Sequence, residues 1–170
     1  MKYIFFSLIF ICFESFSQKK TTNTEIETQY FLKQFLSNDS MTYYIKEIGI
    51  IEDNSLCKVY SDSIILKRDS IYINKLLSNK SKMKFKISFQ SNIKIIAEKK
   101  FYKIDKDSIL KNEKNRILII SKPIFINNYK YCIFYYKDFF SGLGGSDELS
   151  LFEKINEIWV KKEEFCSSIN

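Results

Sequence analysis

Residues 117–136, with the sequence ILIISKPIFINNYKYCIFYY, decide the fold that we expect for this chain. The apolar run that begins at Ile117 is typical of a buried strand, and Ile124–Ile126 predicts a second strand after the only proline of the chain. Asn127-Asn128 tolerates the positive backbone angles of a tight turn. Because Tyr129–Tyr136 is again apolar, we expect it to return as the antiparallel partner of the strand before the turn.

The residues that follow extend this pattern towards the C-terminus. Leu149–Lys154 and Trp159–Phe165 predict two further strands, and Ile155-Asn156-Glu157 is expected to join them as a turn. The segment therefore predicts an antiparallel meander. The loop before its last two strands, residues 141–148, contains three of the four glycines of the chain.

This Gly-rich loop is the candidate binding surface of the sequence. Backbone N–H groups of such a loop can cradle phosphate, but a phosphate loop leads from a strand into a helix and follows a fixed glycine spacing. Here the loop joins two predicted strands and its exit is acidic, which disfavours phosphate. We therefore expect a loop that needs unusual backbone angles, with a weaker hypothesis that it contacts a partner. The residues of this binding hypothesis are Gly142, Leu143, Gly144, Gly145 and Asp147.

Upstream of residue 116 the sequence predicts one well-marked helix. Thr24-Glu25-Ile26-Glu27 fits a capping box, and the apolar residues Ile26, Tyr30, Phe31 and Phe35 recur at helical spacing up to about Leu36. A second helix that runs from Asp69 or Ser70 through Leu77 is an alternative to a strand over the same residues. The other predicted strands are Tyr43–Ile51, Leu56–Leu66, the alternating stretch Met83–Phe89, and Ile93–Ala97 paired back on it, before a charged connector over Asp105–Asn115.

Together these segments predict an α+β domain, in which an N-terminal amphipathic helix packs on a curved, mostly antiparallel β-sheet that ends in a β-meander. The composition agrees, because alanine occurs only once, at Ala97, and aromatic residues make up 16% of the chain. A length of 170 residues suits a single domain. We assign residues 1–17 to a signal peptide and residues 18–170 to this domain.

The N-terminus has the features of that signal peptide. Lys2 provides a basic start, and the apolar run Tyr3–Phe13 is too short to span a bilayer but suits a signal-peptide core. Ser15 and Ser17 place small residues at the two positions that define a cleavage site. We therefore expect cleavage after Ser17 and a secreted or periplasmic protein without a transmembrane anchor. A lipoprotein attached through Cys12 is less favoured, because a bulky residue precedes that cysteine.

After that cleavage three cysteines remain, Cys57, Cys132 and Cys166, an odd number that leaves at least one thiol unpaired. Cys132 lies in an apolar strand and is expected to be a buried core residue. A Cys57–Cys166 disulfide is one option, and the sequence does not choose among the pairings. Because no C-x-x-C spacing is present, zinc ribbons and thioredoxin-type redox sites are not supported.

The residue composition limits the catalytic chemistry that this chain can perform. The chain has no histidine, so Ser-His and Cys-His nucleophile pairs are excluded, and we expect no cofactor and no metal. A calcium ion held by Asp138, Asp147 and Glu148 is a minor alternative, because their spacing matches no named loop. The net charge is +7, but only Arg68 and Arg116 among the 27 basic residues are arginine and the lysines are scattered, so we expect no nucleic-acid partner.

Residues 116–166 resemble a group of small, uncharacterised bacterial secreted proteins and lipoproteins. The resemblance lies in the strand 121–125, the apolar strand 132–136, the Gly-rich loop, and the closing hairpin with Lys154 and Trp159. Many members of that group have cysteines that flank the glycines, and this chain has none there. The resemblance implies export and a similar fold, and it implies no activity.

Two functions fit these observations. The favoured one is a non-catalytic binding or accessory module of the cell envelope, whose partner is an unknown protein or envelope component. The alternative is a secreted hydrolase that uses carboxylates, for which Asp105, Asp107, Asp138 and Asp147 are candidates outside any distinctive motif. A cleft that gathers carboxylates would favour the hydrolase, and a flat aromatic or glycine-loop patch would favour the binding module.

Overall fold

The computed structural model describes the chain over seven ranges, to which every structural statement below refers. The predicted signal peptide, Cys57, Gly142 and Leu143 lie outside these ranges, as do residues 85–89 of one predicted strand. The described ranges are 23–38, 40–49, 58–60, 62–78, 83–84, 91–139 and 144–169.

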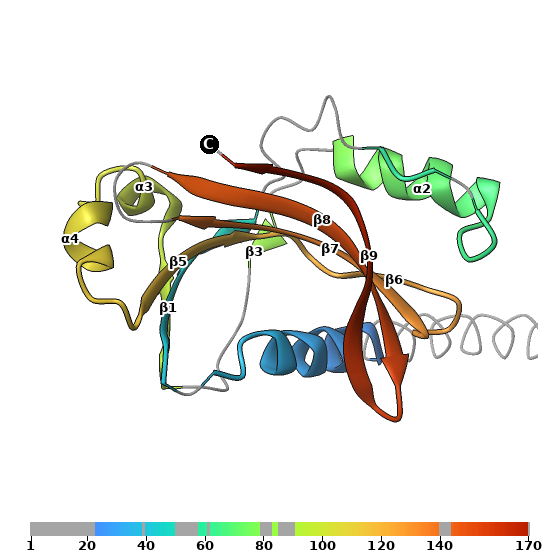
Figure 1. Cartoon of the computed structure of the whole chain (residues 1–170), viewed down its shortest axis with the longest axis horizontal. Coiled ribbons are helices and arrows are strands. Elements are labelled where there is room, and N and C mark those ends of the chain that lie inside the picture. The colour runs from blue at the N-terminus through green and yellow to red at the C-terminus, as the bar shows by residue number, and fades with distance from the viewer. Residues whose placement is uncertain are drawn as a thin grey trace, which may run out of the picture.

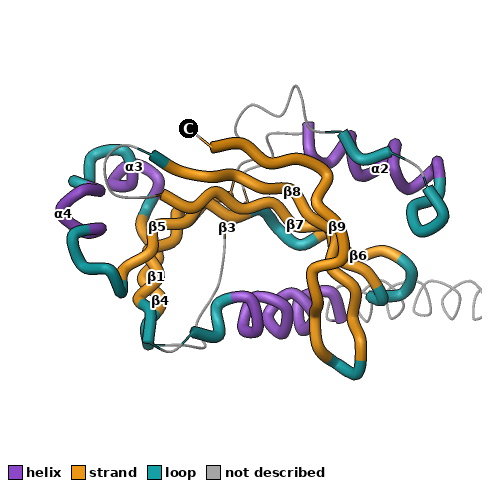
Figure 2. The backbone as a smooth tube through the Cα atoms, viewed as in Figure 1, coloured by secondary structure: helices purple, strands orange, loops and turns teal. Residues whose placement is uncertain are grey.

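Seven strands form one curved sheet with the spatial order β4-β1-β5-β7-β8-β9, and β6 pairs with β7 (Figures 1 and 2). A separate pair joins β2 (Ile48–Gly49) and β3 (Met83–Lys84) in antiparallel fashion. The strands of the large sheet are β1 (Thr42–Lys46), β4 (Ile93–Ile96), β5 (Asn115–Ile120), β6 (Ile124–Ile126), β7 (Tyr131–Phe139), β8 (Gly145–Ile155) and β9 (Ile158–Ile169).

The large sheet is mixed. β1 runs parallel to both of its neighbours, β4 and β5, whereas β5, β6, β7, β8 and β9 are joined by antiparallel pairs. Parallel pairing is possible here because long connections separate these strands in the chain, including two short helices between β4 and β5. The C-terminal part is the antiparallel meander that the turn signals predict.

The fold class predicted from the sequence is therefore wrong. The molecule is a strand-rich mixed sheet with several short helices, not an α+β domain defined by one helix on a mostly antiparallel sheet. β4 pairs with β1 in parallel, although Ile93–Ala97 was expected to pair back on 83–89. The described parts of Leu56–Leu66 are irregular rather than a strand. The pattern of apolar residues along the sequence locates the strands. The direction of a strand and its neighbour in the sheet depend on the connections between strands.

Helices lie on both sides of the sheet, as Figure 1 shows. The described residues 23–35 are helical and lie on the concave side of the curved sheet, whereas α2 (Lys67–Ser78) lies on the opposite side. α3 (Glu98–Phe101) and α4 (Lys106–Leu110) lie near one end of the sheet beside β5. Within the described ranges, no helix has the length and apolar character needed to cross a lipid bilayer.

Each side of the sheet buries its own core. We call the side next to residues 23–35 the concave face and the side next to α2 the α2 face. On the concave face, the Phe31 ring packs edge-on against Phe134, with 4.9 Å between ring centroids, and against Trp159 at 5.5 Å. On the α2 face, Ile73 and Leu77 of α2 are buried together with residues from the alternate positions of β7 and β8.

The apolar side of the helical residues 23–35 differs from the predicted stripe. Phe31 and Leu32 are buried, whereas Ile26 is 59% exposed. Thr24 lies inside the helix rather than capping it, because residue 23 is already helical, and the Thr24 hydroxyl forms a hydrogen bond with the Tyr129 hydroxyl at 2.9 Å. Phe35 is partly buried against the concave-face core.

Two local predictions in the C-terminal half are confirmed. Asn127 and Asn128 have φ angles of 50° and 52° in the turn between β6 and β7. Cys132 is a free thiol in the core, and burial raises its pKa well above the usual range. Cys166 is disulfide-bonded, and Cys57, one of the partners that the sequence left open for it, lies outside the described ranges.

Candidate functional site

The predicted loop site is only partly within the described ranges. Gly144 lies just before β8, and Gly145 is the first residue of that strand. A Cβ atom added to Gly145 would lie 2.8 Å from the carbonyl oxygen of Asp138 on the neighbouring strand. Glycine is therefore required at this position for the close approach of two backbones, which is a structural reason.

Asp147, the acidic member of the predicted loop site, lies on the α2 face. Its carboxylate accepts a hydrogen bond from the Tyr135 hydroxyl at 3.3 Å and another from the Ser168 hydroxyl. Successive residues of a strand point to opposite faces, so Asp147 and Glu148 lie on different sides of the sheet. The predicted calcium arrangement of Asp138, Asp147 and Glu148 is therefore not formed. Across the described ranges, no three His, Cys, Asp or Glu side chains gather in a way that could hold a metal ion.

A different group of polar side chains gathers on the concave face, on neighbouring strands of the sheet. The alternation along β7 places Tyr136 and Asp138 on the same side as the buried Phe134. Strand pairing then places Glu148 of β8 beside Tyr136, and Arg116 of β5 near Asp138. We call this group the concave-face cluster, and its members are Tyr43, Arg116, Tyr136, Asp138, Glu148 and Lys161.

One half of the cluster is an ion pair in which one carboxylate oxygen lacks a hydrogen-bond partner. Arg116 Nη1 lies 3.4 Å from Asp138 Oδ2, and the Asp138 side chain is 19% exposed. Asp138 Oδ1 is buried and has no hydrogen-bond partner. Burial raises the pKa of the Asp138 carboxyl, while the Arg116 guanidinium and the backbone N–H of Phe139 oppose that rise. Burial also raises the pKa of Tyr43, which lies next to Arg116 in the sheet.

In the other half of the cluster, both carboxylate oxygens of Glu148 have partners. The Tyr136 hydroxyl donates to Glu148 Oε2 at 2.9 Å, and Lys161 Nζ lies 2.8 Å from Glu148 Oε1. The Ser150 hydroxyl also donates to Glu148. Burial, together with the hydrogen bond to the Glu148 carboxylate, raises the pKa of Tyr136 to about 12. Tyr136 is therefore a neutral hydrogen-bond donor at physiological pH.

The cluster has balanced charge and adjoins aromatic rings. Each carboxylate is paired with a cation, Asp138 with Arg116 and Glu148 with Lys161, and Glu164 also contacts Lys161 at the exposed rim. The Phe35 ring lies 5.2 Å from that of Tyr136, measured between ring centroids. Such a surface combines donors, acceptors and rings without a dominant charge.

Sequence reasoning missed most of this cluster, although one signal was available. Asp138 was a candidate only as one of several turn-type acids. Its position in strict alternation with Cys132, Phe134 and Tyr136 places an acid on a buried face, which is unusual enough to indicate a site. Of the other candidate acids, Asp105 caps α4 by accepting from the Ser108 N–H at 3.1 Å.

The function has to be inferred from this geometry. The resemblance of residues 116–166 to small bacterial secreted proteins stays a prediction. No protein-family model, no curated protein and no solved structure matches this chain.

Proposed function

We propose that this protein is a non-catalytic binding module of the cell envelope, and that it binds a neutral, hydroxyl-bearing ligand such as a glycan segment at the concave-face cluster. The observation that supports this most is the buried Oδ1 atom of Asp138, which lacks a hydrogen-bond donor. A ligand hydroxyl supplies that donor, and its own oxygen can accept from the adjacent Arg116 guanidinium.

The charge of the cluster favours a neutral ligand. A phosphate or a nucleotide would need unpaired cations, and here Arg116 and Lys161 each already face a carboxylate. Hydroxyl groups both donate and accept, so they suit paired charges, and the partly buried rings of Tyr136 and Phe35 adjoin the cluster.

A binding role fits the cluster better than hydrolysis does. Two-carboxylate hydrolysis needs one acid that can give a proton and one carboxylate that is free to act as a base or nucleophile. Asp138 satisfies the first requirement in part, because burial raises its pKa. Glu148 does not suit the second, because Tyr136, Ser150 and Lys161 occupy its oxygens.

Action outside the cytoplasm is part of the proposal. It is supported by the disulfide of Cys166, since disulfides persist mainly in oxidising compartments, and by the signal-peptide pattern of residues 1–17. Mass spectrometry of the protein from its native cells should find Gln18 as the first residue. A lipid on Cys12 or an intact Met1 would contradict cleavage after Ser17.

The binding proposal is tested by calorimetric titration with a panel of neutral cell-wall oligosaccharides. We expect Asp138→Asn and Arg116→Gln to weaken binding by about tenfold or more, because each removes a charge-assisted hydrogen bond. Two matched controls make the same chemical changes away from the cluster. Asp147→Asn changes a residue on the α2 face of the sheet and Arg68→Gln changes a residue of α2, and both should leave the affinity unchanged. Absence of binding, or equal losses in the controls, would contradict the proposal. Release of new reducing ends would support the hydrolase instead.

A further inference from the structure

The outward side of α2 exposes large apolar side chains. Ile71 is 63% exposed and Tyr72 is 58% exposed, and Leu76 is also exposed one helical turn beyond Tyr72. The inward side of the same helix buries Ser70, Ile73 and Leu77. A helix turns by about 100° per residue, so the exposed residues lie on the side that faces away from the sheet.

The segment before α2 extends this surface. The Asn74 side chain makes hydrogen bonds with both the N–H and the carbonyl of Val59, at 2.9 and 2.8 Å. These bonds fix residues 58–60 alongside the helix. Val59 is buried, so its neighbour Tyr60 points outward and is 73% exposed. We call Tyr60, Ile71, Tyr72 and Leu76 the α2 apolar patch.

The charges around the α2 apolar patch are mostly basic. Lys67 and Arg68 lie in the first turn of α2 and Lys75 in the last, and the Arg68 side chain is 87% exposed. Asp69 is the only acidic residue of the helix, and it lies 3.3 Å from Arg68. The chain as a whole has a net charge of +7. The patch therefore combines apolar side chains with a net positive charge on the helix that carries it.

We propose that the α2 apolar patch docks on the surface of an anionic lipid bilayer. Ile71 and Leu76 would enter the boundary between headgroups and acyl chains, the tyrosines would lie at headgroup level, and the basic residues would face lipid phosphates. The aliphatic residues distinguish this partner from a nucleic acid, which offers no apolar layer to receive them. The proposal is independent of ligand binding at the concave-face cluster, which lies on the other side of the sheet.

Vesicle co-sedimentation tests this proposal with the protein purified in the form that the cell produces. One set of vesicles contains phosphatidylcholine alone, and the other contains about one third phosphatidylglycerol. We expect binding to the anionic vesicles only. The double variant Ile71→Ser/Tyr72→Ser should lower the partition coefficient by about tenfold or more, because both apolar contacts are lost. Arg68→Gln should lower it by about fivefold, the effect of one charge near the surface.

Matched controls separate the patch from the overall charge. Lys33→Gln removes the same charge from the helical residues 23–35, and Ile158→Ser/Val160→Ser removes comparably exposed apolar side chains from the β8–β9 hairpin; both should bind like the wild type. Tyr72→Trp adds a second tryptophan to the chain, whose own Trp159 is buried on the concave face, and the emission of the new side chain should shift to the blue when anionic vesicles are added.

Several results would overturn the proposal. One is wild-type binding by the Ile71→Ser/Tyr72→Ser variant, which would leave only the net charge as the cause. Another is an equal loss in the hairpin variant. A third is the absence of vesicle binding. If the protein instead forms a dimer or an RNA complex that the Ile71→Ser/Tyr72→Ser variant abolishes, the patch binds a second copy of the chain or a nucleic acid.

Discussion

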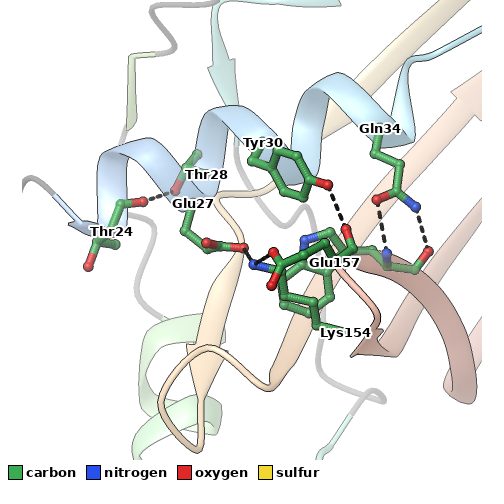
Figure 3. Close-up of polar contacts among 8 residues, drawn as sticks. Thr24, Glu27, Thr28, Tyr30, Gln34, Lys154 and Glu157 are labelled. Carbon is green, nitrogen blue, oxygen red and sulfur yellow. Dashed lines mark hydrogen bonds and ion pairs between the residues drawn. The ribbon is translucent and has the colours of Figure 1, made fainter.

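The side-chain amide of Gln34 forms a matched pair of hydrogen bonds with the backbone of Trp159. Gln34 Nε2 donates to the Trp159 carbonyl at 2.8 Å, and the Trp159 N–H donates to Gln34 Oε1 at 2.9 Å (Figure 3). β9 is an edge strand of the large sheet, and edge strands leave outward backbone groups without a strand partner. Gln34 satisfies these groups as an additional strand would, so the helical residues 23–35 close part of the edge.

Neighbouring contacts strengthen this junction between the helix and the hairpin. The Tyr30 hydroxyl donates to the Glu157 carbonyl at 2.6 Å, and Lys154 Nζ lies 2.9 Å from Glu27 Oε1 and 2.8 Å from Glu157 Oε2 (Figure 3). All these partners on the hairpin lie at or next to the β8–β9 turn. The junction therefore orients the helix relative to the sheet, while the aromatic core supplies the apolar contact.

Substitution of Gln34 by leucine should destabilise the protein and expose the edge of β9. The variant keeps the side-chain size but leaves the Trp159 N–H and carbonyl without these partners, so we expect a loss of about 1–3 kcal/mol in the free energy of unfolding. Urea unfolding measures this loss. Lys33→Leu, at the neighbouring exposed position, is the control and should change stability by less than about 0.5 kcal/mol. Equal stability of the two variants would show that the Gln34 bonds contribute nothing.

Phe31 should be the most costly position of the helical residues 23–35 to truncate. Its ring contacts those of Phe125, Phe134, Phe152 and Trp159, and its side chain is buried. Phe31→Ala should therefore lower the free energy of unfolding by about 3–5 kcal/mol. Ile26→Ala, in the exposed position that periodicity alone assigns to the core, should change it by less than about 0.5 kcal/mol. Similar losses in both variants would contradict the packing described here.

The C-terminal half of the fold was predictable because its signals are local. Asn127-Asn128 and Asn156-Glu157 are turn dipeptides, and a tight turn makes the flanking strands antiparallel neighbours. The order of β4, β1 and β5 was not predictable in this way. These strands are far apart in sequence, and their parallel pairing depends on the path of the chain between them.

The same reasoning explains what was missed at the concave-face cluster. The face on which Asp138 lies follows from period-two alternation within one strand. Its partner Arg116 and the neighbouring Tyr43 belong to β5 and β1, so their approach requires the strand order. The predicted loop site rested on a local signal that has a structural cause. One of its glycines, Gly145, is required because the backbone of the neighbouring strand lies too close for a Cβ atom.

The turn between β8 and β9 offers a way to stabilise the protein. Asn156 and Glu157 have φ angles of 49° and 64°, as expected for a two-residue turn in which both residues are left-handed. Glu157→Gly removes a strain of about 1–2 kcal/mol and loses an exposed ion pair with Lys154 worth about 0–1 kcal/mol. We expect a net gain of about 1 kcal/mol in thermal or urea unfolding. Asn156→Gly should gain less, because asparagine tolerates this region. A loss of stability in Glu157→Gly would mean that the lost ion pair and the greater freedom of glycine in the unfolded chain outweigh the released strain.

The ionisation of Asp138 should make the protein less stable as the pH rises. Burial raises the pKa of this carboxyl above its ordinary 3.8, so the folded protein retains the proton at pH values where the unfolded chain has lost it. The stability contributed by Asp138 is therefore fully present at low pH, and it is lost as the pH rises through the folded-state pKa.

Asp138→Asn isolates this effect, because asparagine does not titrate. The free energy of unfolding of the variant minus that of the wild type should increase as the pH rises from 3.8, the ordinary value of the carboxyl, through the folded-state pKa, as measured by urea unfolding at several pH values. Arg116 opposes the rise of the Asp138 pKa, so the same comparison in an Arg116→Gln background should show a larger increase that extends to higher pH. If the difference between Asp138→Asn and the wild type stays constant or decreases with pH, burial does not control this carboxyl, and the unpartnered Oδ1 atom loses its significance for ligand binding.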